Sequence, residues 1–190
     1  MAQQLTWLPK VLRDAGLKVN EAPGWQTRGH GDIGHIDGIL LHHTAGPLHG
    51  NAPSLGTVTN GRGPPNALAG PLCNLHLARD GTFTVVSARK AWHAGSGYWH
   101  GISDGNSHMI GIEMENTGLP NDQPWSVPEV DAAVRACAVL LKYCHLGLIT
   151  CAGHKEYAPK RKIDPSFDMT KFRSRVAALM AGPAIPLKET

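Results

Sequence analysis

Gly153-His-Lys-Glu-Tyr-Ala-Pro-Lys-Arg-Lys-Ile-Asp-Pro165 is the stretch around which the chain is organised. It places an imidazole, an ammonium group and a carboxylate on one short loop, in the side chains of His154, Lys162 and Asp164. Imidazole and carboxylate are both good zinc ligands, and Lys162 and Asp164 project to the same side if the backbone between them is extended. Two candidate ligands do not fix a metal, so a third has to come from another segment.

An apolar run of strand length, Gly38-Ile-Leu-Leu-His-His-Thr44, ends abruptly in two histidines. Successive side chains of a strand point to opposite faces, so His42 and His43 cannot easily bind the same ion. At most one of them is a ligand. Taken alone, the segment favours the interpretation that both histidines cap a strand end, and it does not say which one would bind a metal.

A second strand is predicted over Met109 to Asn116, where Glu113 and Glu115 share a face with Gly111. Carboxylate side chains are unusual in a central strand, so their presence there requires an explanation. A solvated face and a catalytic role both remain open from this segment alone. Beside the candidate ligands, Glu113 can take or return a proton.

Two further segments carry candidate structure or binding residues. Cys73 to Ala78 and Thr82 to Val86 read as a hairpin around the turn Arg79-Asp80-Gly81. Ala91-Trp92-His93-Ala94-Gly95 follows as an aromatic and histidine-rich loop without apolar periodicity. Such side chains suit the wall of a binding groove, although packing beneath the loop would explain Trp92 equally well.

Three segments predict helices. Thr6 to Ala15 carries apolar residues at helical spacing and stops at a glycine. Ser126-Val-Pro-Glu129 has the residues of a capping box, and it opens the longest helix, which runs to about His145. Asp168 is placed to cap a last helix that ends near Ala181.

The composition bounds the class of protein. With 190 residues, of which 42% are hydrophobic and 17% charged, the chain is long enough for one well-buried domain and short for two. A formal charge of +3 without a Lys/Arg-rich stripe argues against nucleic acid as a partner. No stretch approaches the roughly 18 apolar residues of a membrane span. We expect one domain over residues 1–182, a tail or linker stub over 183–190, and no membrane insertion.

The N-terminus shows no basic start followed by an apolar run and a small-residue cleavage site, so no secretory signal is visible. This predicts synthesis in the cytoplasm, which argues against a disulfide framework. The cysteines also lack the paired Cys-x-x-Cys spacing of zinc modules. We therefore expect buried thiols at Cys73, Cys137, Cys144 and Cys151.

Five separated motifs run through the chain in a fixed order. They are Leu41-His-His-Thr44, Arg79-Asp-Gly81, Ala91-Trp-His-Ala-Gly95, Ile110-Gly-Ile-Glu113, and Gly153-His154 with Lys162-Ile-Asp-Pro165. Together they resemble the motifs of the zinc-dependent N-acetylmuramoyl-L-alanine amidases, whose relatives include small bacteriophage amidases and the animal peptidoglycan-recognition proteins. The resemblance covers roughly Gly38 to Phe172. The segment before Gly38 has no family motif, and Asn74 stands where many members have a histidine, so Asn74 is assigned no catalytic part.

The resemblance implies an α/β (α+β) fold, with a central mixed β-sheet flanked by helices as in the peptidoglycan-recognition proteins. It also implies one zinc ion held by His42, His154 and Asp164. It selects His42 over His43, because the histidine directly after the apolar run is the ligand in this family. Three protein ligands leave one position open, as in catalytic zinc sites.

The resemblance further assigns Glu113, rather than Glu115, as the glutamate that moves protons, and Lys162 as the group that stabilises a developing oxyanion. We expect substrate contacts from Trp92, His93 and Asn116. The implied reaction is hydrolysis of the amide bond between N-acetylmuramic acid and L-alanine in peptidoglycan or muropeptides, by a monomer.

The role in the cell is a choice between alternatives. A cytoplasmic enzyme that cuts cell wall needs either a soluble fragment as its substrate, as in muropeptide recycling, or a route out, as in phage lysis through a holin-type pore. We expect a bacteriolytic phage or prophage endolysin, by analogy only. A non-catalytic peptidoglycan-binding module is a further alternative, which the acidic ligand Asp164 disfavours.

Overall fold

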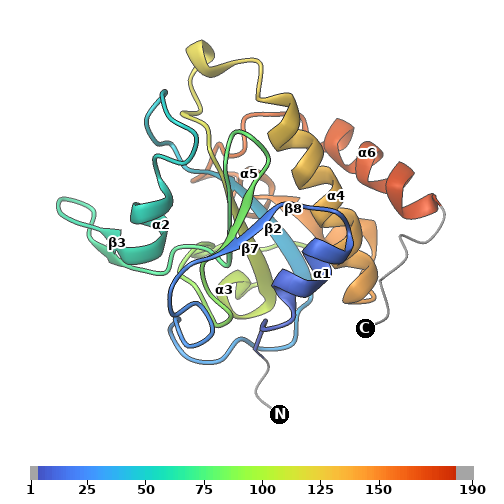
Figure 1. Ribbon diagram of the computed structural model, residues 1–190, viewed down its shortest axis with the longest axis horizontal. Coiled ribbons are helices and arrows are strands. Elements are labelled where there is room, and N and C mark those ends of the chain that lie inside the picture. Colours follow the sequence, from blue (N-terminus) through green and yellow to red (C-terminus); the bar gives the residue numbers. More distant parts are fainter. Residues whose placement is uncertain (1–3, 183–190) are drawn as a thin grey trace.

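A six-stranded mixed sheet forms the centre of the computed structural model, which describes residues 4–182 (Figure 1). The strand order is β1-β6-β5-β7-β2-β8, and every neighbouring pair is parallel except the β5–β6 hairpin. The strands are β1 (Val19–Glu21), β2 (Gly38–His43), β5 (Leu75–Leu77), β6 (Phe83–Val85), β7 (Met109–Met114) and β8 (Cys151–Gly153). The mixed sheet flanked by helices confirms the predicted fold class.

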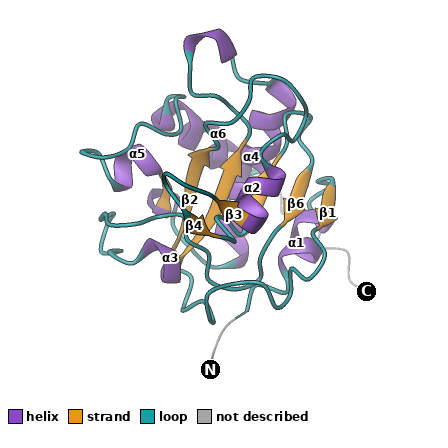
Figure 2. Ribbon diagram, turned by 90° about the vertical axis from the view of Figure 1, so that its left-hand side faces the viewer, coloured by secondary structure: helices purple, strands orange, loops and turns teal. Residues whose placement is uncertain are grey.

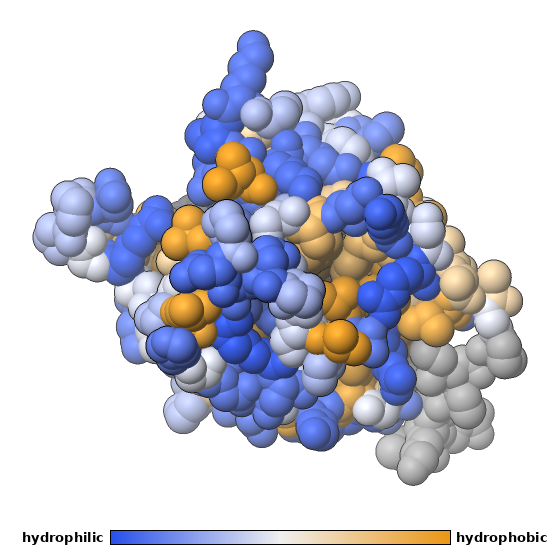
Figure 3. All heavy atoms as spheres, turned by 90° about the horizontal axis from the view of Figure 1, so that it is seen from above, coloured by the Kyte–Doolittle hydropathy of each residue, from blue (hydrophilic) through white to orange (hydrophobic). Residues whose placement is uncertain are grey.

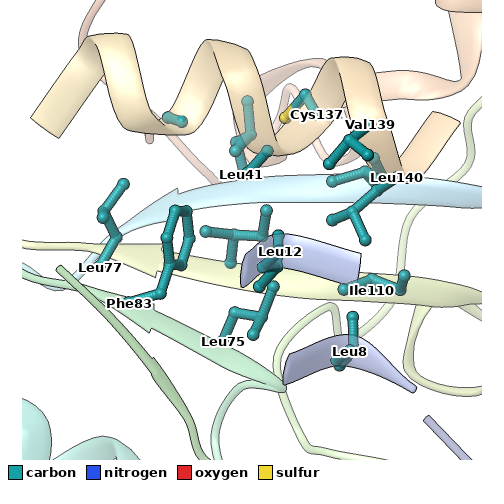
Figure 4. Packing of buried hydrophobic residues seen from close by; sticks show 14 of the residues in the cluster. Leu8, Leu12, Leu41, Leu75, Leu77, Phe83, Ile110, Cys137, Val139 and Leu140 are labelled. Atoms are coloured by element: carbon teal, nitrogen blue, oxygen red, sulfur yellow. The ribbon is translucent and has the colours of Figure 1, made fainter. Parts of the chain in front are cut away.

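Helices cover both faces of the sheet. They are α1 (Leu8–Asp14), α2 (Leu55–Asn60), α3 (Gly105–His108), α4 (Val127–Tyr143), α5 (His154–Tyr157) and α6 (Met169–Ala181). The largest hydrophobic core lies on the side of α1, α4 and α6, where Leu12, Leu41 and Leu140 meet (Figure 4). The shorter helices α2, α3 and α5 lie on the other side, together with a small ribbon of β3 (Gly61–Arg62) and β4 (Leu68–Ala69) (Figure 2).

Strand β2 shows how the sequence divides its side chains between the two faces. Ile39 and Leu41 belong to the core beneath α4, whereas Leu40 packs with the smaller core on the opposite face. Every residue of the strand is buried, as expected for a central parallel strand covered on both sides. The alternation sends His42 to the face of Leu40 and His43 to the face of Trp125, whose ring centroid lies 6.4 Å from that of His43.

The predicted capping box of the longest helix is wrong. The side chain of Ser126 makes no capping bond to the helix; its hydroxyl donates instead to the carbonyl of Arg79. Glu129 turns into the protein, is fully buried, and has no hydrogen-bond partner on either carboxyl oxygen among the described residues. The tertiary contact with Arg79 therefore replaces the local one that the sequence pattern predicts.

The N-terminal segment lies along the β6 side of the sheet. Strand β1, which the sequence analysis did not predict, pairs in parallel with β6. Beyond it, the amide of Ala88 donates to the carbonyl of Trp25 at 2.9 Å, and the amide of His30 donates to the carbonyl of Lys90 at 2.9 Å. The segment after β1 is thus irregular but tied to the rest of the fold by backbone hydrogen bonds.

All four cysteines are free thiols. Cys73, Cys137 and Cys151 are buried as predicted, and Cys144 is half-buried at the end of α4. Viewed from above, hydrophilic side chains cover most of the surface, and hydrophobic ones show between them in separate places (Figure 3). Within residues 4–182, no helix has both the length and the apolar character to cross a membrane. The predicted tail over 183–190 lies outside the described residues.

Candidate metal centre

The carboxyl ends of three parallel strands bring the predicted site together. In the register of the sheet, His42 of β2 lies beside Glu113 of β7, and Leu41 lies beside Gly153 of β8. His154, which follows Gly153 directly, is therefore held next to His42. Ligand sites of parallel sheets form at this end of the strands, because the chain leaves the sheet there and polar side chains collect.

Three donor atoms converge at this edge. The Nδ1 atoms of His42 and His154 lie 2.8 Å apart, and Oδ2 of Asp164 lies 3.2 Å and 3.1 Å from them. All three residues are buried. Ligands about 2.0–2.2 Å from a tetrahedral zinc ion lie roughly 3.4 Å from one another, so these spacings fit that ion. We call His42, His154 and Asp164 the donor cluster.

The far side of each imidazole is also fixed. Nε2 of His154 lies 2.8 Å from the carbonyl oxygen of Ala94, which can only accept, so this nitrogen carries the hydrogen and Nδ1 keeps its lone pair. Nε2 of His42 lies 3.1 Å from Nδ1 of His93. Burial, followed by the nearby His154, lowers the pKa of His42 to about 4. The ring is neutral at pH 7, as a metal ligand must be.

His93 packs between His42 and strand β7 because that strand carries a glycine. A Cβ atom at Gly111 would lie 2.6 Å from Cγ of His93, which is closer than carbon atoms can approach. Burial lowers the pKa of His93 well below its usual value. The predicted substrate residue His93 borders the cavity, and it also supports the ligand His42.

A cavity of about 300 Å³ opens beside the donor cluster and is bordered by both predicted catalytic residues, Glu113 and Lys162. Glu113 is half-buried, and its Oε2 is shielded from solvent and has no hydrogen-bond partner among the described residues. Burial, with a smaller contribution from Asp164, raises the pKa of Glu113 to about 8. An unpaired buried carboxyl oxygen at the edge of a cavity is placed to interact with a bound molecule.

Glu115, the alternative that the sequence analysis set aside, has a different environment. Its carboxylate accepts from the amide and hydroxyl of Ser54 at 2.7 Å and 2.9 Å and lies 2.8 Å from Nε2 of His76. Burial alone would raise the pKa of Glu115, but the hydrogen bonds from His76 and Ser54 lower it. Glu115 therefore fastens the segment before α2 to the sheet and is absent from the cavity wall.

Trp92 forms part of the cavity wall and is supported by the N-terminal segment. Its ring stacks on that of His30, with centroids 4.4 Å apart and planes 17° from parallel. The ammonium group of Lys90 lies 5.7 Å from the centre of the Trp92 ring. The segment without a family motif thus contributes to the groove through this stack.

Asn116 and Asn74 lie away from the cavity. Both are buried, and Asn116 donates to the carbonyl of Asp122 and accepts from the amide of Gly118, so its amide holds a loop. The oxygen of Asn74 accepts from the amide of Gly111 at 3.0 Å, which is a structural role. Among the predicted site residues, Asn116 is the one that the structure does not bring to the cavity.

Several cavity residues were not singled out from the sequence. They are Arg62, Leu68, Leu72, Arg161 and Ile163. Arg62 and Leu68 belong to the β3–β4 ribbon, within a stretch rich in proline and glycine that has no periodicity. The sequence could have indicated Ile163, because it stands between Lys162 and Asp164. In the structure its side chain is 77% exposed.

Comparison with known proteins identifies the same family as the motifs. A family model described as N-acetylmuramoyl-L-alanine amidase matches residues 32–167. The chain is 34% identical over 105 residues to the 1,6-anhydro-N-acetylmuramyl-L-alanine amidase AmpD of Haemophilus influenzae, covering 53% of this chain and 55% of that protein. It is 25% identical over 134 residues to the N-acetylmuramoyl-L-alanine amidase AmiD of Escherichia coli, covering 67% and 48%. The chain spans about half the length of these curated relatives.

Solved structures share the fold. A crystal structure of AmpD superposes with a TM-score of 0.65 at 22% identity, covering 92% of this chain and 99% of that one. The endolysin LysCS of Clostridium intestinale superposes with a TM-score of 0.60 at 15% identity, covering 84% and 95%. At these identities the likeness shows the fold alone. The family assignment rests on the sequence: with its model matching residues 32–167, the chain belongs to the N-acetylmuramoyl-L-alanine amidase family.

Proposed function

We propose that this chain is a zinc-dependent hydrolase that cleaves the amide bond between N-acetylmuramic acid and L-alanine. The observation that carries the proposal is the convergence of the donor cluster beside a cavity that Glu113 and Lys162 also border. Two imidazole nitrogens and a carboxylate oxygen that face one point at the edge of a cavity are the arrangement that a catalytic metal site requires.

The donor atoms of the cluster are of the types that zinc binds. Two neutral imidazole nitrogens and one carboxylate oxygen are a donor set that zinc prefers, and their spacing suits a tetrahedral site with one open position. When bound, zinc polarises a carbonyl group and lowers the pKa of water. The hydrogen bond from His154 to Ala94 and the contact between His42 and His93 hold both rings in the orientation that ligation requires.

The other two residues supply proton transfer and charge. With zinc bound, the positive charge of the ion would favour the ionised carboxylate of Glu113. Glu113 would then take a proton from the attacking water and return it to the amine of L-alanine as the amide bond breaks. The ammonium group of Lys162 would stabilise the negative charge that develops on the carbonyl oxygen. The Oε2 atom of Glu113 is shielded from solvent, so little water competes for it and its interactions are stronger.

The form of the substrate follows from the relatives. The AmpD relatives carry the name of amidases for 1,6-anhydro-N-acetylmuramyl compounds, and an AmiD complex holds anhydro-N-acetylmuramic acid-L-Ala-D-gamma-Glu-L-Lys. We propose that this chain acts on a muramoyl compound with a stem peptide of the same type. The names favour a soluble muropeptide over the polymeric wall, whereas the endolysin role has only the fold likeness in its support.

One assay tests the activity and the form of the substrate together. Purified peptidoglycan and soluble muropeptides, with and without the 1,6-anhydro ring, are incubated with the protein in the presence and absence of a chelator. Mass spectrometry then identifies the bond that is cut. New L-alanine amino termini that disappear with chelator are the expected result.

Other outcomes contradict specific parts of the proposal. New reducing ends would mean glycosidic cleavage and would overturn it. Binding without any cleavage by the zinc-loaded protein would indicate a recognition module. Faster turnover of polymer than of the anhydro compound would support the endolysin role over recycling.

A further inference from the structure

Arg62 is a charged cavity residue that neither the motifs nor the proposed chemistry uses. It lies in strand β3 of the ribbon, and its side chain borders the same cavity of about 300 Å³ as the donor cluster. Its Nε donates to the carbonyl of Asn66 at 2.8 Å. Within residues 4–182, the two Nη groups of Arg62 have no hydrogen-bond or ion-pair partner.

The second arginine of the cavity shows the contrast. Arg161 also borders the cavity, but its Nη2 donates to the carbonyls of Ala94 and Ser96 at 2.8 Å and 2.7 Å. Arg161 therefore links two loops. The guanidinium of Arg62 is oriented by one bond and keeps its outer edge available, which is the edge that binds a carboxylate with two parallel hydrogen bonds.

The ribbon that carries Arg62 is fastened at its base. A Cβ atom at Gly61 would lie 2.3 Å from the carbonyl oxygen of Leu68, and one at Gly70 would lie 2.4 Å from that of Thr59, so the two strands approach as only glycine allows. Leu68 packs against the small hydrophobic cluster that includes Val58. Arg62 is thus presented to the cavity from a fixed support.

The charges around the cavity favour an anionic group near this arginine. Three cationic side chains border it, and only two carboxyl groups do. Of these, Asp164 faces the two histidines of the donor cluster, and Glu113 lies half-buried near the end of β7. Neither forms a salt bridge with Arg62 in the described part of the chain.

We infer that Arg62 binds a carboxylate of the stem peptide, namely the α-carboxylate of a γ-linked D-glutamate in the second position. The inference rests on the proposed function, which supplies the stem peptide. A glutamate linked through its side chain keeps its α-carboxylate free. That group lies two residues from the scissile carbonyl, a reach of roughly 7 Å along an extended chain, and Arg62 borders the same cavity as the donor cluster.

The test compares two substrates that differ in this carboxylate alone. One is N-acetylmuramoyl-L-Ala-γ-D-Glu-L-Lys, and the other carries D-isoglutamine, whose neutral carboxamide has the same shape. We expect the wild-type protein to prefer the carboxylate by about tenfold in kcat/KM, the size of one partly exposed charge-assisted contact. In Arg62→Gln the ratio should fall to near one, and Arg62→Lys should keep part of it, because charge remains but the paired geometry is lost.

The matched control is Arg175→Gln. Arg175 pairs with Asp131 on the exposed surface between α6 and α4, so this variant should keep the wild-type ratio. A wild-type protein that cuts both substrates equally would overturn the inference while leaving the proposed function intact, as would an Arg62→Gln variant that keeps the preference. Failure of the zinc-loaded wild type to cut the muramoyl–alanine bond in either substrate would overturn the proposed function itself.

Discussion

Two clusters of histidine and aspartate lie at opposite ends of the same strands. The donor cluster sits at the carboxyl ends of β2, β7 and β8. His35, Asp37 and His108 lie just before the amino ends of β2 and β7, and their side chains are 71%, 42% and 40% exposed. Nδ1 of His35 contacts Oδ1 of Asp37 at 2.9 Å, and Nδ1 of His108 contacts Oδ2 at 2.9 Å.

The difference between the clusters lies in where their atoms point. In the donor cluster, one oxygen of Asp164 faces both histidines, and the three donors meet around one point. In the amino-end cluster, each histidine takes a different oxygen of Asp37, so the nitrogens diverge. Within residues 4–182, the donor cluster is the one group of three such residues whose donor atoms lie within 4.8 Å of each other. Residue types alone do not make a metal site; convergence and burial do.

The test with the largest expected effect replaces the aspartate of each cluster by asparagine. We expect Asp164→Asn to lose bound zinc and to lower kcat/KM by more than about 1,000-fold, because a primary ligand matters more than the outer partners, which are worth about 10- to 100-fold. Asp37→Asn should keep the metal content and activity of the wild type. Zinc per chain is measured by elemental mass spectrometry. Equal zinc loss in both variants would remove the distinction between the clusters.

The next test separates charge stabilisation from metal binding. Lys162→Ala should lower kcat by about 100- to 1,000-fold, the usual effect of losing one electrostatic donor, while zinc content stays unchanged. Lys160→Ala, an exposed lysine two residues away, is the matched control and should retain activity. An active Lys162→Ala protein would remove Lys162 from the mechanism.

We expect a smaller effect on zinc binding from a change at Gly111, which packs against His93 next to the donor cluster. In Gly111→Ala the new methyl group would displace His93 from His42, so we expect zinc affinity to fall by about 10- to 100-fold. Gly147→Ala is the control, because a Cβ atom there meets nothing within 4 Å. Competition with a chromogenic chelator measures both affinities. Unchanged affinity in Gly111→Ala would mean that His93 does not position His42.

The last test concerns Glu129, a buried carboxyl group that belongs to neither cluster, and its effect is measured on stability and not on activity. Glu129 is buried like Asp164, but within residues 4–182 its carboxyl oxygens have no hydrogen-bond partner. Burial raises the pKa of Glu129 to about 8, an effect that Arg79 partly opposes and that the charges of Glu115 and Asp122 reinforce. Since the folded pKa exceeds the unfolded value, this group stabilises the fold at low pH and loses that contribution as pH rises toward 8.

Replacing Glu129 should therefore flatten the pH profile of stability. Between pH 5 and pH 8 the free energy of unfolding of Glu129→Gln should fall by roughly 2–3 kcal/mol less than that of the wild type. Urea unfolding at several pH values, at one fixed zinc concentration, measures the difference. Parallel profiles for the two proteins would show that Glu129 titrates normally in the fold.

The part of the site that the sequence could predict is the part carried by strand periodicity and motif spacing. The alternation of β2 placed His42 and His43 on opposite faces, and the parallel register then brought His154 beside His42. Alternation placed Glu113 and Glu115 on one face of β7, and the motif resemblance made the choice between them. These positions depend on local geometry and on the order of strands, which a sequence pattern records.

The residues that could not be predicted depend on distant contacts. Glu129 fits a capping box, but Ser126 bonds to the carbonyl of Arg79 in the hairpin turn. Arg62 reaches the cavity because a ribbon in an irregular stretch folds back over it, and no periodicity marks that ribbon. In each case a contact between segments far apart in sequence overrides the local pattern.

The N-terminal segment also has a practical consequence for anyone shortening this protein. The family model begins at residue 32, so trimming to that boundary removes β1 and the His30 ring. Strand β6 would then become the outermost strand with unpaired backbone groups, which is a template for aggregation. Trp92 would lose its stacking partner at the same time. The stretch outside the family match therefore protects the solubility of the fold as well as the shape of its groove.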